Sequence, residues 1–142
     1  MNALVDDQMT RLRKALDSTA SEEFYQDYCE NHRVYFGQYN GATPISSEIS
    51  SQAKHNELRE KLNELQLYWN KIQSVIDNGT LTTDQIEDII YTSQKIGGSE
   101  LLTRFDMQST PPDIFITNYS MLNIMLMRDR EDSIFDKTKE WL

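Results

Sequence analysis

The chain has 142 residues, of which 38% are hydrophobic and 26% are charged, and its 23 acidic and 14 basic residues give a formal net charge of −9. This length predicts one domain with a modest core, because the apolar content is below the average of soluble domains. The acidic balance excludes general electrostatic attraction to DNA, RNA or anionic membranes, so any contact with nucleic acid must be local.

The amino-terminal segment predicts an amphipathic helix. Between Leu4 and Leu16 the apolar residues recur at steps of three and four, which places them on one face of a helix. Arg11, Arg13 and Lys14 fall outside this stripe, near the negative end of the helix dipole. We expect these three bases to form a solvated face.

A second short helix and a strand follow. Thr19 begins a Thr-x-x-Glu sequence with the spacing of a capping box, which predicts a helix start. Residues 33–41 (RVYFGQYNG) favour extended backbone, and Gly37 would let another segment of the chain approach closely. Asn40 and Gly41 supply the turn that ends this strand.

The middle of the chain predicts a helical hairpin. Apolar residues from Leu58 to Ile76 recur at alternating steps of four and three, which is the seam of a helix packed against another helix. Thr82 and Gln85 can cap a second helix, which we expect to end at the double glycine 97–98. We expect the seam to be core, and its pairing with a partner or a second copy is the alternative.

Residues 111–126 (PPDIFITNYSMLNIML) have the pattern of a strand, a loop and a helix of a parallel sheet. The strand is expected at 113–116, the loop at 117–119, and a charged helical tail after the helix. The predicted fold is therefore helix-rich α/β, with two parallel strands, adjacent or one position apart, and five or six helices. Two strands rarely form an independent sheet, so we also expect low stability or self-association through exposed apolar faces.

A few residues constrain location and metal content. Asp6 and Asp7 stand where a secretory signal carries positive charge, and no apolar run approaches the length of a membrane span. Cys29 is the single cysteine, and Cys29-x-x-His32 is half of a zinc pattern without a second pair of ligands beyond the distant His55. We expect a cytoplasmic protein with no metal site and no membrane contact.

Three motifs, in this order, resemble those of superfamily-2 helicases. Residues 1–16 (MNALVDDQMTRLRKAL) resemble motif Ia of the branch with PTNAL-x-x-DQ, and residues 39–44 (YNGATP) resemble the YDGDTP that follows the next strand. Residues 111–122 (PPDIFITNYSML) resemble motif Ib, PPDILLTNPDML. The chain looks like an internal fragment of the first RecA-like domain of the large DEAD/DEAH-box helicases of bacterial phage-defence islands, from motif Ia to just past motif Ib.

The resemblance implies one partial RecA-like domain over residues 1–142, with residues 46–98 as an inserted helical segment. In that family a G-x-G-K-[ST] phosphate loop lies upstream of motif Ia and a D-E-x-H motif lies downstream of motif Ib. Neither is present here, and the double glycine 97–98 is followed by Ser99 and Glu100 instead of lysine and a hydroxyl. The resemblance thus implies a truncated fragment that is inactive alone and has no cofactor of its own, because ATP and magnesium are bound in the parent family by the missing motifs. Its candidate partners are neighbouring helicase polypeptides that carry those motifs.

The resemblance also implies where nucleic acid would be held. In the family, the three loops lie at the carboxyl edge of the parallel sheet and hold one strand by its phosphates without reading bases. Carried over to the matching positions, the contacts are Asn2, Ala3, Gly41, Thr43, Thr117 and Asn118. Tyr119 replaces the proline of the commoner motif. By residue type alone, Asn2 and Thr117 could be only helix caps, and Thr43 only part of a connector.

Two other functions remain open from the sequence. The first is a small acidic helical module that binds a protein through the apolar seam at 58–76. The second is a DNA mimic, which rests on the charge of −9 alone, because the acidic residues are scattered along the chain and do not repeat at phosphate spacing.

Overall fold

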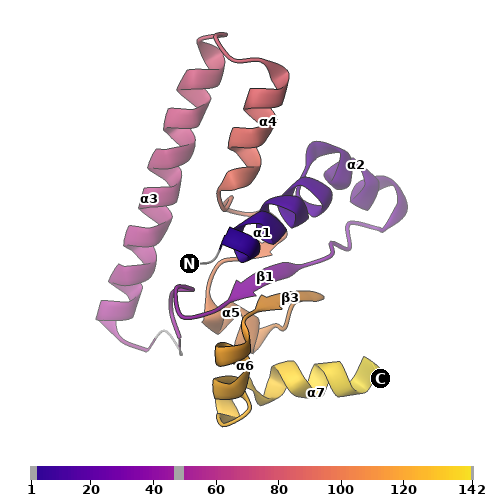
Figure 1. Ribbon diagram of the computed structural model, residues 1–142, viewed down its shortest axis with the longest axis vertical. Coiled ribbons are helices and arrows are strands. Elements are labelled where there is room, and N and C mark those ends of the chain that lie inside the picture. The colour runs from indigo at the N-terminus through magenta and orange to yellow at the C-terminus, as the bar shows by residue number, and fades with distance from the viewer. Residues whose placement is uncertain (1–2, 47–49, 142) are drawn as a thin grey trace.

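The computed structural model of the chain describes residues 3–46 and 50–141 (Figure 1). Within these ranges it contains seven α-helices, one short 3-10 helix and one parallel sheet of three strands. In chain order the elements are α1 (Ala3–Leu16), α2 (Thr19–Tyr28), β1 (Phe36–Tyr39), α3 (Gln52–Asp77), α4 (Thr83–Thr92), β2 (Glu100–Leu101), α5 (Arg104–Ser109), β3 (Ile114–Thr117), α6 (Tyr119–Met125), η1 (Asp129–Glu131) and α7 (Asp132–Trp141).

The sheet has the order β2-β1-β3, and both pairs of strands are parallel. This confirms a helix-rich α/β fold in which the two expected strands are direct neighbours, in register from Phe36↔Ile114 to Tyr39↔Thr117. The expected strand count of two is wrong, because β2 is a third strand. Its two residues are too few to show a strand pattern, and they are extended because they pair with Phe36 and Gly37 of β1.

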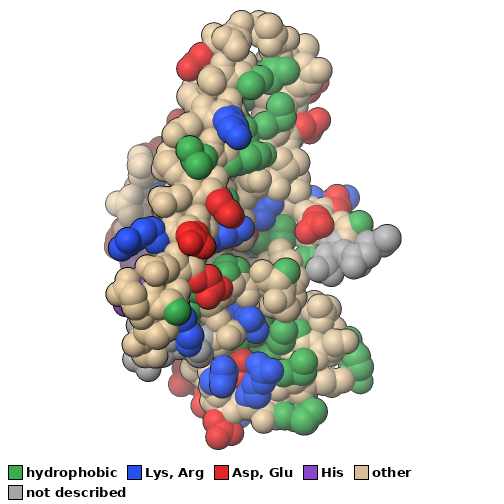
Figure 2. Space-filling model, turned by 90° about the vertical axis from the view of Figure 1, so that its left-hand side faces the viewer, with side chains coloured by type: hydrophobic (Ala, Val, Ile, Leu, Met, Phe, Trp, Pro, Cys, Tyr) green, Lys and Arg blue, Asp and Glu red, His purple; other side chains and the backbone are tan. Residues whose placement is uncertain are grey.

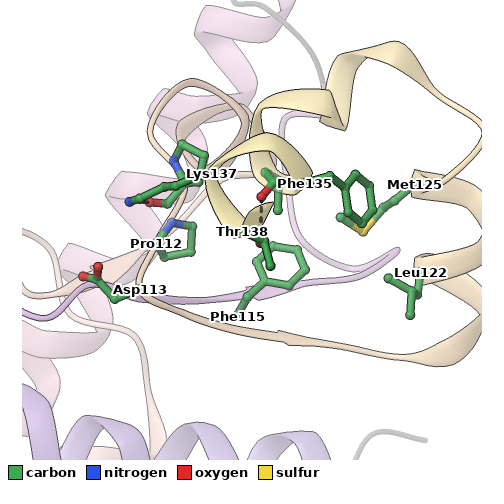
Figure 3. A pocket seen from close by; sticks show the side chains of 10 residues that line it. Pro112, Asp113, Phe115, Leu122, Met125, Phe135, Lys137 and Thr138 are labelled. Atoms are coloured by element: carbon green, nitrogen blue, oxygen red, sulfur yellow. Dashed lines mark hydrogen bonds between the residues drawn. The ribbon is translucent and has the colours of Figure 1, made fainter. Parts of the chain in front are cut away.

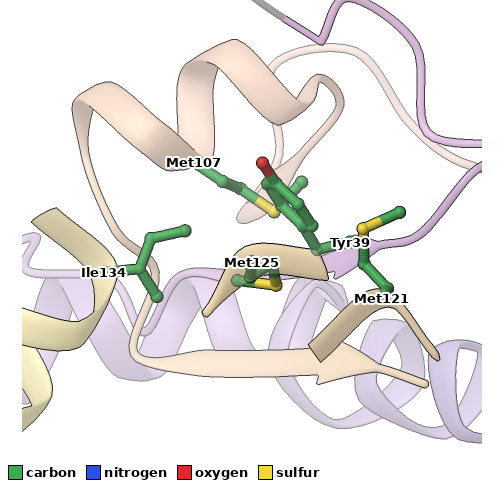
Figure 4. Close-up of a cluster of buried hydrophobic side chains, with 5 residues drawn as sticks. All are labelled: Tyr39, Met107, Met121, Met125 and Ile134. Atoms are coloured by element: carbon green, nitrogen blue, oxygen red, sulfur yellow. The ribbon is translucent and has the colours of Figure 1, made fainter. Parts of the chain in front are cut away.

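Helices cover both faces of the sheet. Helix α1 packs on β1 and β3 from one side, and α5, α6 and α7 lie on the other side (Figure 1). On the second side lies the main apolar cluster, in which Tyr39 of β1 meets three methionines and an isoleucine of these helices (Figure 4). Its members are Tyr39, Met107, Met121, Met125 and Ile134.

Gly37 allows α5 to approach β1, as its sequence context predicted. A Cβ atom at this position would overlap the sulfur of Met107. We expect Gly37→Ala to lower the free energy of unfolding by about 1–3 kcal/mol, measured by urea denaturation, because the core would be overfilled. Gly41→Ala is the matched control, since no atom lies within 4 Å of the added Cβ. Equal stabilities of the two variants would contradict the close contact.

The long helix α3 and the shorter α4 run side by side and project away from the sheet (Figure 1). Leu65 and Ile72 of the apolar seam are buried, and the Trp69 indole N–H donates to the Gln94 carbonyl at 2.8 Å. The capping box of Thr82 with Gln85 is confirmed. That residues 46–98 are an insertion remains a prediction.

Three local predictions are wrong. Helix α4 ends at Thr92 and not at the double glycine, and Gly97 instead makes a left-handed turn, with φ of 78°, just before β2. Helix α2 is capped by Ser18, whose hydroxyl accepts from the Ser21 N–H, and Thr19 is its first helical residue. Arg13 does not belong to a solvated face, because it is 7% exposed.

Arg13 is buried by a partner that is distant in the chain. Its guanidinium makes two hydrogen bonds to the carboxylate of Glu100, Nε–Oε2 at 2.7 Å and Nη2–Oε1 at 3.0 Å. Its Nη1 also donates to the carbonyls of Tyr91 and Thr92, at 3.3 and 3.2 Å. One side chain of α1 therefore joins the end of α4 to β2.

Candidate nucleic-acid interface

The loops that follow β1 and β3 leave the sheet at the same edge. The strands are parallel neighbours, and their last residues, Tyr39 and Thr117, are opposite each other. The Thr117 hydroxyl donates to the Tyr39 carbonyl at 2.7 Å, which fastens the two strand ends together. The structure thus brings Gly41 and Thr43 to the same edge as Thr117 and Asn118, where open α/β sheets bind ligands.

The turn after β1 is closed by side chains. The Asn40 Oδ1 accepts from the N–H groups of Ala42 and Thr43, at 2.9 and 3.2 Å. The Thr43 hydroxyl donates to the Gln38 carbonyl at 2.6 Å and accepts from the Asn40 N–H at 3.1 Å. Thr43 is therefore buried and shapes the turn, whereas Gly41 and Ala42 are exposed at its tip.

Asn40 carries a donor that the protein leaves unused. The residue is 2% exposed, and its Nδ2 has no hydrogen-bond partner. The amide cannot be reversed, because its Oδ1 already accepts from two N–H groups. A buried unpaired donor costs about 1–3 kcal/mol. The sequence indicated only a turn residue at this position, and no feature of the sequence shows the missing acceptor.

Asn118 is the cap of α6. Its Oδ1 accepts from the Met121 N–H at 2.8 Å, and it was Thr117 that the sequence offered as a helix cap. Asn118 is exposed, directly after the end of β3. Tyr119 is 78% exposed and packs against no other ring among the described side chains.

The first motif is only partly described. Ala3 is the first residue of α1 and is exposed. In Figure 1 the amino end of α1 lies on the same side of the molecule as the carboxyl ends of β1 and β3. Asn2 lies outside the described residues, so its predicted contact is not placed.

Two arginines that the sequence did not single out also reach this edge. The Arg104 Nε donates to the Thr43 carbonyl at 2.9 Å, and the Arg130 Nη1 donates to the Ser46 carbonyl at 3.2 Å. They belong to α5 and η1, and only the folded chain brings them together. Figure 2 faces this edge and shows Lys and Arg side chains gathered on its lower half, with acidic side chains below them.

A buried polar network lies next to this edge of the sheet. The Tyr39 hydroxyl donates to Glu131 Oε1 and accepts from the Gln108 amide, both at 2.7 Å. Glu131 is fully buried, its Oε2 has no hydrogen-bond partner, and Arg128 Nη1 lies 3.8 Å from its Oε1. Burial raises the pKa of the Tyr39 hydroxyl to about 12; the hydrogen bond from Gln108 lowers this pKa in part, and the hydrogen bond to Glu131 raises it further. The network joins the end of β1 to α5 and η1.

An apolar hollow of about 560 Å³ lies beside β3, away from the loops (Figure 3). Phe115, Leu122, Met125 and Phe135 are among its lining residues, and Lys137, which also lines it, donates to the Pro111 carbonyl at 2.7 Å. Such a surface suits apolar side chains and not phosphate. β3 is also an edge strand of the described sheet, so no described strand pairs with its outer side.

Among the described residues, no group of three or more His, Cys, Asp or Glu side chains could hold a metal ion. No helix in the same part of the chain is both long enough and apolar enough to cross a membrane.

The chain is similar to one curated protein, Druantia protein DruE of Escherichia coli (strain UMEA 4076-1), with 33% identity over 174 residues. The match covers the whole chain but only 9% of that protein. No protein-family model matches the chain, and no solved structure matches it. The chain therefore corresponds to a small part of a much longer relative.

Proposed function

We propose that the chain is an internal part of the first RecA-like domain of a large superfamily-2 DEAD/DEAH-box helicase of bacterial phage defence. Its role there is to hold the backbone of one nucleic-acid strand. The observation that carries the proposal is the pairing of β1 with β3, which brings the two motif loops to one sheet edge. The similarity of the whole chain to a small part of a longer protein supports its place within a larger polypeptide.

The chemistry of the edge suits phosphate oxygens. It offers neutral donors, namely the amide nitrogen of the exposed Asn118 and the backbone of the exposed Gly41, and residues 40–46 and 118, the described parts of the two loops, include no carboxylate. Neutral donors and backbone N–H groups hold phosphates without reading bases. Weak, sequence-independent binding is the expected result, since the chain as a whole carries a charge of −9.

ATP hydrolysis belongs to other segments in this proposal. It requires magnesium held near the phosphates, charge stabilisation and an oriented water, and the chain lacks the sequence motifs that supply them. The open edge of β3 and the apolar hollow beside it offer a place where further segments of the sheet would pack, from the same parent protein or from neighbouring helicase polypeptides. Magnesium-dependent phosphate release from ATP by the purified chain would show that ATP hydrolysis does not depend on other segments.

The experiment is a titration of the full chain with fluorescent single-stranded DNA and RNA at low salt, followed by anisotropy. Asn118→Asp keeps the acceptor for the Met121 N–H and replaces the amide donor by a charged oxygen. We expect it to weaken binding roughly tenfold, because an unfavourable contact replaces a hydrogen bond to an anion. Asn63→Asp on exposed α3 adds the same charge far from the edge and is the matched control.

Either of two results would overturn the binding function. One is no binding by the wild-type chain at low salt, and the other is the same effect of both substitutions. Comparison of the two oligonucleotides also shows whether DNA or RNA is preferred, and contacts to phosphates alone predict similar affinities for both.

The interaction-module function has one observation in its favour. An apolar hollow of about 190 Å³ opens between α3 and α4, and Val75 at its rim is 43% exposed. Leu65 and Ile72 of the seam are nevertheless buried within the chain. The pair of helices α3 and α4 is thus mainly core. A chain that sediments as a monomer at high concentration would argue against self-pairing through these helices.

A further inference from the structure

Arg104 and Arg130 hold the same connector from two different elements. Arg104 bonds to the Thr43 carbonyl through Nε, and Arg130 bonds to the Ser46 carbonyl through Nη1. The backbone of α5 adds two bonds, from Arg104 N–H to the Pro44 carbonyl and from Phe105 N–H to the Ile45 carbonyl, both at 3.0 Å. Both guanidinium groups are therefore held against the connector that follows the exposed tip at Gly41.

These two arginines are oriented but not neutralised. Neither forms an ion pair with a carboxylate of the described residues, whereas Arg11, Arg13 and Arg33 of the same chain all do. A guanidinium has five N–H donors, and each of these two gives one nitrogen to a carbonyl. The remaining donors suit a phosphate, which a guanidinium can bind through two parallel hydrogen bonds.

The acidic residues near the pair limit how such a contact can act. Asp106 of α5, Asp129 of η1 and Asp132 at the start of α7 are exposed, and Glu131 is buried with one oxygen bonded to Tyr39. Their charges offset the long-range attraction of the arginines. A phosphate would therefore be bound by direct contact, and the number of contacts can be counted from the salt dependence.

We propose that Arg104 and Arg130 each bind a backbone phosphate of the nucleic-acid strand, beyond the contacts of the two motif loops. This rests on the proposed function, because the strand that crosses the loops at Gly41 and Asn118 is the one that reaches the arginines. The two side chains turn a weak neutral edge into one with two charged phosphate contacts.

The test compares two double variants of the full chain that have the same net charge. Arg104→Gln with Arg130→Gln removes the proposed contacts, and Arg59→Gln with Lys61→Gln removes two positive charges from α3. Binding of fluorescent single-stranded DNA is measured over a series of salt concentrations. We expect the first variant to lower the slope of log affinity against log salt by about 1.4, since each contact with a single strand contributes about 0.7, and the second to leave it unchanged.

The outcomes separate this inference from the proposed function. If the slope of log affinity against log salt is the same in both double variants and the wild type, while Asn118→Asp binds more weakly, the arginine contacts are wrong. The proposed function would still hold in that case. No binding by the wild type would overturn both. If Arg104→Gln disturbs folding, as judged by circular dichroism, Arg130→Gln alone is used. Arg130 is exposed and is expected to account for half of the change, and an unchanged slope would again count against the inference.

Discussion

Replacing Arg13 by methionine is expected to lower the free energy of unfolding by about 3–5 kcal/mol, because the substitution leaves the Glu100 carboxylate buried without its counter-charge. Glu100 has a side chain that is 0% exposed, and its remaining described partner is the Gln94 amide at 3.2 Å. The carbonyls of Tyr91 and Thr92 at the end of α4 lose their donor in the same variant. The substitution therefore loosens the attachment of α4 to the sheet as well.

Urea denaturation followed by tryptophan fluorescence measures this effect. Arg11→Met is the matched control on the same helix, since its ion pair with Asp7 is exposed, and it is expected to cost about 0.5 kcal/mol or less. The double variant Arg13→Met with Glu100→Met should be more stable than Arg13→Met alone, because it removes the unpaired charge. A single variant within 1 kcal/mol of the wild type would contradict the role of the pair.

The second large effect is a loss of stability in alkaline solution that depends on Tyr39. The pKa of this hydroxyl is raised to about 12 in the folded chain, from the ordinary 10.0. The raised pKa stabilises the folded state fully below pH 10, and this contribution disappears as the pH rises from about 10 to about 12, because the unfolded chain loses the proton first. Two pKa units correspond to roughly 2–3 kcal/mol.

Tyr39→Phe removes the titrating group and should abolish this part of the pH dependence. At neutral pH the variant is expected to be about 1–3 kcal/mol less stable than the wild type, since Glu131 and Gln108 lose a buried partner. Tyr119→Phe is the control, because Tyr119 is 78% exposed. Parallel curves of unfolding free energy against pH for the wild type and Tyr39→Phe would show that folding does not raise the pKa of the Tyr39 hydroxyl.

The candidate site could be predicted in part. The motif spacing placed Gly41 and Thr43 after one strand, and Thr117 and Asn118 after another, and the strands are neighbours. The roles of single atoms could not be predicted, because they depend on which hydrogen-bond partners the folded chain brings within reach. The Thr117 hydroxyl bonds to the adjacent strand, and the cap of α6 is Asn118.

The elements that the sequence by itself determined are those with local causes. Each of these elements depends on residues only a few positions apart in the sequence. They are the apolar periods of α1 and α3, the capping box at Thr82 and the extended residues of β1 and β3. The net charge of −9, which limits nucleic-acid binding to a local surface, is likewise a property of composition.

The tertiary structure decided what distant residues do together. β2 exists as a strand because β1 lies beside it, and Arg13 is buried because Glu100 comes 87 residues later in the chain. Arg104 and Arg130 meet at one connector for the same reason. Pairing across long loops depends on contacts made in the folded chain, and a pattern of period two or 3.6 contains no information about which segments become neighbours.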